Sequence, residues 1–119
     1  MASDSDPRAI SALTHNIHEA GLDESVRILQ ADVADAARDV PVGAAIVTNV
    51  PYGHGTEGGR ELHDSYRRFG DVLRAREDLG PVVVLSGHRD FIADTGLKWQ
   101  EVAGFRNRGL PVRLLRLVR

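Results

Sequence analysis

Two short, nearly all-apolar runs constrain the fold of this 119-residue chain more than any other feature: GAAIVTN at residues 43–49 and VVVLS at residues 82–86. Strands of a parallel sheet have such nearly continuous apolar sequences because helices cover both faces of the sheet. Between the runs, Leu62, Tyr66, Phe69 and Leu73 recur at helical spacing amid dense charge, which predicts an amphipathic helix over residues 58–78. The pattern favours an α/β fold with parallel pairing and right-handed crossovers.

The rest of the sequence continues this alternation of strands and helices. Asp6 followed by Pro7 is a helix-start signal, and Gly21 is a stop, which predicts a helix over residues 7–20. The other predicted elements are a strand at 25–31, a helical turn on the surface at 33–39, a short helix at 88–95 and strands at 98–105 and 111–118. The last two strands are expected to form an antiparallel hairpin with RNRG, residues 106–109, as its turn.

Length and composition narrow the class of protein. At 119 residues the chain is expected to be a single domain, and without cysteine it has no disulfide, thiolate zinc site or cysteine nucleophile. No apolar run approaches the roughly 20 residues of a membrane-spanning helix, and the first ten residues do not read as a signal peptide. We therefore expect a cytoplasmic protein with no membrane partner.

Polar side chains stand at the ends of three predicted strands: Asp4, Asp32 and Asn49. Ligands of open α/β sheets bind outside the carboxyl ends of the strands. These residues therefore predict a binding site at that edge of the sheet.

The segments SDSDPRAI, LQADVAD and TNVPYG resemble, in order and spacing, class I methyltransferases that use S-adenosylmethionine. GFRNRGLPVRLLRL, residues 104–117, is similar to the end of the THUMP-associated RNA guanine-N2 methyltransferases. The resemblance covers essentially all 119 residues. It implies a Rossmann-like methyltransferase sheet, mostly parallel with an antiparallel C-terminal hairpin, and methylation of guanine N2 in ribosomal or transfer RNA.

The resemblance also implies roles for the acidic strand ends. Asp4 occupies the position whose carboxylate accepts hydrogen bonds from the two ribose hydroxyls of the cofactor, and Asp32 the position that accepts from the adenine amino group, with the amide of Val33 facing a ring nitrogen. The alternatives are a residue that leads into a helix for Asp4 and a surface-turn aspartate for Asp32.

Asn49, Pro51 and Tyr52 match the (Asn/Asp)-Pro-Pro-(Tyr/Phe) motif of amino-group methyltransferases. An exocyclic amine is a poor nucleophile, and acceptance of its protons by the Asn49 side chain and the Val50 carbonyl would hold it in line with the methyl donor. Asn49 thus borders both cofactor and base, and Tyr52 can stack on an extruded base. Position 50 is Val where the family usually has proline, but Pro51 still favours an extended Val50.

Beyond residue 96 the chain has six basic residues and one acidic residue. Arg106 and Arg108 in this basic end are candidates for contacts with RNA phosphates, and the alternative is a strand with solvated arginines. The five histidines show no consistent ligand pattern, so no metal is predicted.

No glycine-rich Gly-x-Gly-x-Gly segment precedes Asp4, although the family binds methionine and the sulfonium there. Residues 1–119 are therefore expected to form one partial methyltransferase domain, as a fragment or half of a split enzyme. The alternative is a non-catalytic nucleic-acid-binding or assembly module derived from a methyltransferase. Two sheet edges would be open around the missing strand, which predicts a homo-oligomer or a partner chain that supplies it.

Overall fold

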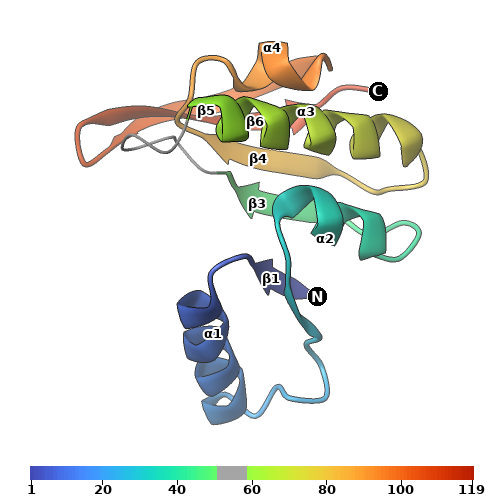
Figure 1. Cartoon of the computed structure of the whole chain (residues 1–119), viewed down its shortest axis with the longest axis vertical. Coiled ribbons are helices and arrows are strands. Elements are labelled where there is room, and N and C mark those ends of the chain that lie inside the picture. Colours follow the sequence, from blue (N-terminus) through green and yellow to red (C-terminus); the bar gives the residue numbers. More distant parts are fainter. Residues whose placement is uncertain (51–58) are drawn as a thin grey trace.

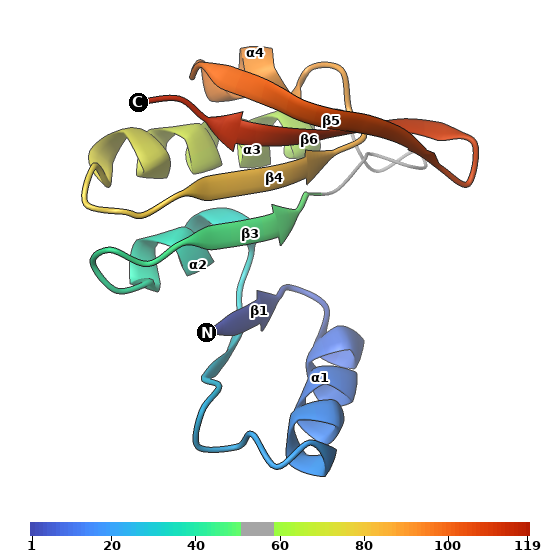
Figure 2. The same cartoon turned by 180° about the vertical axis from the view of Figure 1, so that it is seen from behind.

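The structure is a computed structural model that describes residues 1–50 and 59–119. Its elements, in chain order, are β1 (Ala2–Asp4), α1 (Pro7–Glu19), β2 (Ile28–Gln30), α2 (Val33–Asp39), β3 (Ile46–Asn49), α3 (Gly59–Ala75), β4 (Val82–Ser86), α4 (Phe91–Thr95), β5 (Trp99–Asn107) and β6 (Leu110–Leu117). Figures 1 and 2 show their arrangement from two opposite sides.

The strands form two sheets. β1 pairs with β2 in parallel, and the second sheet has the order β3-β4-β6-β5. In this sheet β3 and β4 are parallel, whereas β6 is antiparallel to both of its neighbours. These pairings confirm the predicted α/β fold with its antiparallel C-terminal hairpin.

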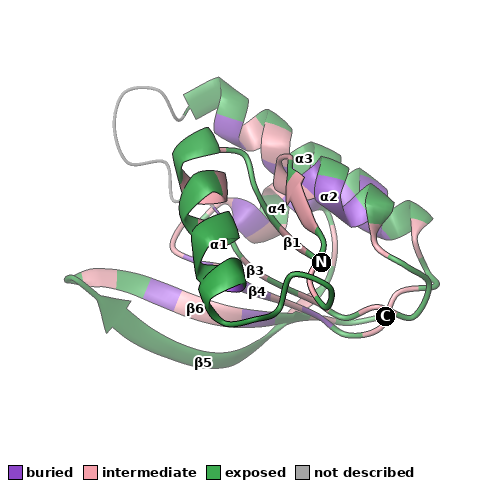
Figure 3. Cartoon of the chain, turned by 90° about the horizontal axis from the view of Figure 1, so that it is seen from below, coloured by how far each residue is buried: buried purple, intermediate pink, exposed green. Residues whose placement is uncertain are grey.

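The core lies between the four-stranded sheet and the helices α2, α3 and α4, which cover the same face of it (Figures 1 and 2). Tyr66 and Phe69 on α3, Val84 on β4, Phe91 on α4 and Leu115 on β6 are completely buried. The Phe91 ring packs edge-on against Tyr66 at a centroid distance of 5.0 Å. Figure 3 shows the contrast between the buried faces of α2 and α3 and the exposed β5 and α1.

The first helix begins as predicted. Asp6 is its N-cap, and its side chain accepts a hydrogen bond from the amide of Arg8 at 2.9 Å. This amide, and then the Arg8 guanidinium, hold the pKa of Asp6 below its usual value. The cap fixes the turn that leads from Asp4, the last residue of β1, into α1.

The predicted helical turn at residues 33–39 is confirmed as a helix, but its placement on the surface is wrong. This segment is the helix α2, and Ala34, Ala36 and Ala37 are buried where it packs against α3. Small alanine side chains let the two helices approach closely, so the composition that suggests a surface turn instead makes a packed interface. Arg76 strengthens it by donating to three carbonyls at the end of α2, including that of Val40 at 2.7 Å.

Several predicted boundaries shift, and the strand predicted at 25–31 is only Ile28–Gln30. The third helix ends at Ala75 rather than at residue 78, and α4 begins at Phe91 rather than at residue 88, because the amide of Asp90 donates to the His88 ring in a tight turn. The final hairpin turn is only Arg108 and Gly109, both with positive φ, so Arg106 lies in β5.

Candidate functional site

A pocket of about 160 Å³ lies at the carboxyl ends of β1, β2 and β3. The structure brings five of the predicted site residues together in its lining: Asp4, Asp32, Val33, Asn49 and Val50. Parallel strands end at a common edge, which is why residues far apart in sequence meet here. Predicted residues Pro51 and Tyr52 lie outside the described residues.

Asp4 ends β1, and its carboxylate is held by the backbone that follows. Its Oδ1 accepts a hydrogen bond from the amide of Asp6 at 2.9 Å. The residue is exposed, so its carboxylate oxygens remain open to a ligand. An exposed, oriented carboxylate is suited to accept from a pair of adjacent hydroxyls.

Asp32 is the N-cap of α2, and its Oδ1 accepts from the amide of Asp35 at 2.9 Å. Its Oδ2 lies 3.0 Å from an Nη2 of Arg68 on α3. Both oxygens therefore have a partner within the protein, and Asp32 caps a packed helix rather than lying in a turn.

Asn49 is the last residue of β3 and lies opposite Leu85 of β4 in the parallel register. The next amide, that of Val50, donates to the Leu85 carbonyl at 3.2 Å, and Val50 is 1% exposed. The Asn49 side chain is exposed and borders the pocket. A rigid, buried residue thus follows an exposed amide group at the end of the strand.

Ser65 on α3 and the serines on either side of Asp4 also line the pocket, whereas Arg68 is linked to it only through its ion pair with Asp32. None of these residues was predicted from the sequence. Ser65 and Arg68 are three apart on α3 and hence on one face of the helix. This spacing was visible in the sequence, but which helix face meets α2 depends on tertiary packing.

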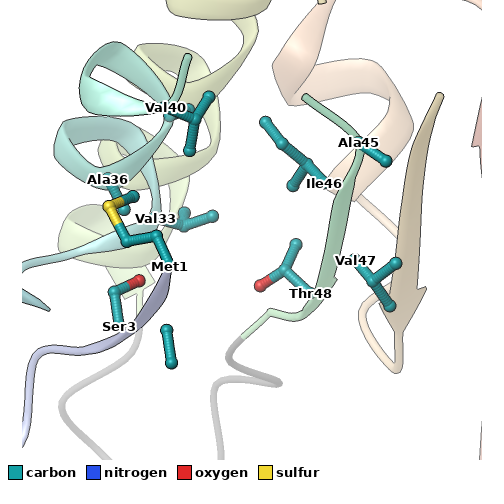
Figure 4. Close-up of a pocket in the computed structure, with 11 residues that line it drawn as sticks. Met1, Ser3, Val33, Ala36, Val40, Ala45, Ile46, Val47 and Thr48 are labelled. Atoms are coloured by element: carbon teal, nitrogen blue, oxygen red, sulfur yellow. The ribbon is translucent and has the colours of Figure 1, made fainter. Parts of the chain in front are cut away.

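A second, larger groove of about 330 Å³ separates the two sheets. One wall is Met1 to Ser3 with residues of α2, and the other is Ala45 to Thr48 of the β3 segment. Figure 4 shows Ile46 and Thr48 pointing from β3 across the groove toward Val33 and Val40.

Backbone groups at both walls of this groove point into it. The amides of Ile46 and Val50 donate to β4 and its flank, so the alternation of a strand directs the amide of Val47 toward the groove. Ala2 donates to Arg27 and Asp4 accepts from Ala31, which turns the amide of Ser3 to the groove from the other side. Among residues 1–50 and 59–119, no strand pairs with either wall, so each wall is an open strand edge.

One arginine of the basic C-terminal end makes hydrogen bonds that stabilise the fold. Arg119 donates through Nη2 to the carbonyls of Leu73 and Arg76, both at 2.9 Å. Arg106 donates one hydrogen bond, to the Gly109 carbonyl, and Arg108 occupies the exposed hairpin turn. The hairpin arginines therefore have guanidinium groups directed at solvent.

Among residues 1–50 and 59–119, no group of three or more His, Asp or Glu side chains is arranged to hold a metal ion. Nor does any helix there have the length and apolar character to cross a membrane.

The pocket lies at the carboxyl ends of parallel strands, where Rossmann-like α/β folds bind their ligands. Comparison with known proteins identifies the family. Residues 1–109 match the RMKL-like methyltransferase domain. The chain belongs to this family.

Curated relatives share the same name, ribosomal RNA large subunit methyltransferase K/L. The protein of Chromohalobacter salexigens is 30% identical over 114 residues, and that of Pseudomonas fluorescens is 29% identical over 114. These matches cover 94% of this chain but only 16% and 15% of the relatives. The chain thus spans a small part of the length of these proteins.

Solved structures share the fold. SMU.472 in complex with SAH superposes with a TM-score of 0.80 at 21% identity, over 97% of this chain and 30% of that one. A predicted N6-adenine-specific DNA methylase from Listeria monocytogenes gives a TM-score of 0.69 at 25% identity, over 94% and 28%. The N-terminal domain of human METTL16 in complex with SAH gives 0.64 at 15%, over 98% and 50%.

Proposed function

We propose that this chain is part of an S-adenosylmethionine-dependent RNA methyltransferase that acts on an exocyclic base amine, guanine N2 in ribosomal or transfer RNA. The observation that carries the proposal is the convergence of Asp4, Asp32 and Asn49 on one pocket. The names of the curated relatives and the SAH complexes of two structural neighbours support the same conclusion.

Each residue of the pocket has a role in this proposal. Asp4 accepts from the ribose hydroxyls, and Asp32 accepts from the adenine amine while the Val33 amide donates to the ring. Bound S-adenosylmethionine supplies the electrophilic methyl group. The side-chain oxygen of Asn49 and the carbonyl oxygen of Val50 accept hydrogen bonds from the N–H groups of the target amine. These bonds orient its lone pair toward that methyl group.

A titration of ¹⁵N-labelled chain with S-adenosylhomocysteine tests the proposal. We expect amide shifts confined to residues that line the pocket, at β1, Asp32 and Asn49, and no such shifts in Asp4→Ala. Glu24→Ala, at an exposed acid outside the pocket, is the matched control. Shifts spread over the molecule, or none, would count against it, and RNA binding without cofactor binding would favour the non-catalytic module.

We further propose that the groove between β1 and β3 receives one parallel strand from a second copy or a partner chain. Two observations support this. Both walls present backbone groups that have no strand beside them among the described residues, and most of the lining residues have apolar side chains. In Figure 2 the arrows of β1, β3 and β4 run in the same general direction, so one parallel strand could pair with both edges.

A further inference from the structure

Arg68 lies on α3 and forms an ion pair with Asp32, the N-cap residue of the neighbouring helix α2. The cap bond from the Asp35 amide fixes Oδ1, and the Arg68 guanidinium, 3.0 Å away, fixes Oδ2. An ionised carboxylate has about four acceptor sites. Two contacts from two helices therefore set the plane of the group and leave further lone pairs free for a ligand.

Arg68 does not itself line the pocket, but its helix α3 supplies part of the wall. Ser65, one turn earlier on the same face of α3, lines the pocket together with Asp32 and Asn49. The Arg68–Asp32 ion pair thus joins α3 to the N-terminus of α2 beside the place where a ligand would lie. A shift of the guanidinium would turn the carboxylate relative to the pocket.

The ion pair contributes little to stability, because its side chains are 49% and 28% exposed. Arg67, its neighbour on the helix, forms an ion pair of ordinary surface type with Asp64 at 2.9 Å. The two arginines differ in one respect that matters here: only the partner of Arg68 borders the pocket.

We propose that Arg68 is a positioning residue that sets the preference of the pocket for adenine, an inference that rests on the proposed function. Adenine presents an amine at the position where hypoxanthine presents a carbonyl oxygen. A carboxylate held in a fixed plane accepts from the amine and repels the carbonyl. A carboxylate free to rotate can turn away from either base, so the discrimination falls.

Adenosine and inosine, titrated separately into the ¹⁵N-labelled full chain, measure this preference as a ratio of dissociation constants. The wild-type chain is expected to prefer adenosine by about tenfold or more, the usual value of one hydrogen bond to a charged acceptor. In Arg68→Met the preference falls at least about threefold while the melting temperature changes by no more than a few degrees. Arg67→Met, the matched control on the same helix, keeps the wild-type ratio.

The possible outcomes distinguish a failure of the role proposed for Arg68 from a failure of the proposed function. A wild-type ratio retained in Arg68→Met, or lost equally in Arg67→Met, overturns the role of Arg68 and leaves the proposed function standing. Asp32→Asn is expected to remove the preference, which supports Asp32 as the acceptor. A wild-type chain that binds neither nucleoside at millimolar concentration, or binds both equally, overturns the pocket assignment and this inference together.

Discussion

Asn49 combines an exposed amide group with a rigid backbone on its carboxyl side. The pairing of β3 with β4 and the burial of Val50 fix the backbone position of Asn49, and hence the point from which its side chain extends. We predict that Asn49→Ala abolishes methyl transfer in a reconstituted enzyme and leaves cofactor affinity within a few-fold, because the lost acceptor acts mainly in the transition state. Single-turnover methylation and a cofactor titration measure the two effects. Activity near wild type would remove Asn49 from the catalytic group.

The hairpin arginines lead to a second prediction. If Arg106 and Arg108 each neutralise one phosphate, replacing both with Ala lowers the slope of log affinity against log salt by about 1.4 for single-stranded RNA. Filter binding over a range of salt concentrations measures this slope. Arg27 before β2 and Arg67 on α3, both exposed and outside the hairpin, provide the double-alanine control. An unchanged slope would return Arg106 and Arg108 to the interpretation of solvated arginines.

Pocket residues that lie at the ends of strands could be predicted from the sequence. Asp4, Asp32 and Asn49 lie at or just after the ends of predicted strands, and parallel strands bring such ends to one edge. Arg68 was not predictable, because its contact with Asp32 depends on how α2 docks on α3. A dense pattern of charge on a helix does not reveal which one of its arginines faces a neighbouring helix.

At the scale of elements, the interface between α3 and α4 depends on one glycine. A Cβ at Gly70 would lie 2.3 Å from the carbonyl oxygen of Thr95, so the backbones approach too closely for any side chain. We predict that Gly70→Ala destabilises the protein by about 1–3 kcal/mol through overpacking, despite the better helix propensity of alanine. Urea denaturation measures the change in the free energy of unfolding.

Gly59 on the same helix is the matched control, because a Cβ there meets no atom within 4 Å. Gly59→Ala is expected to be neutral or stabilising by up to about 1 kcal/mol. Equal effects of the two substitutions would mean that helix propensity, and not the contact with Thr95, determines the cost.

The elements themselves were predictable to different degrees. The run VVVLS gave β4 without error, since an apolar, β-branched run between turn residues has few other structures open to it. The burial of α2 was misjudged although Val33, Ala36, Ala37 and Val40 recur at helical spacing, because alanine side chains are too small to mark a buried face clearly. The helix that covers this face, α3, follows later in the chain.

At the scale of the whole molecule, the groove between β1 and β3 divides the sheets. Val47 in its wall is 81% exposed, and its amide points away from β4. Open edges with an apolar lining pair readily with another chain. The expectation from sequence that the chain has two open edges thus agrees with the position of the groove, whereas its occupant depends on which chains are present.

The last prediction is that the chain alone associates with a second copy through this groove. Light scattering at micromolar concentrations should give a mass above the 13.0 kDa of one chain, and Val47→Pro should shift it toward the monomer by removing an edge donor while sparing the bonds to β4. Val42→Pro is the control, since Val42 is 79% exposed and precedes Gly43 with φ 78° in a turn that accepts proline. A wild-type chain that stays at 13.0 kDa, or equal effects of the two prolines, would contradict pairing at this edge.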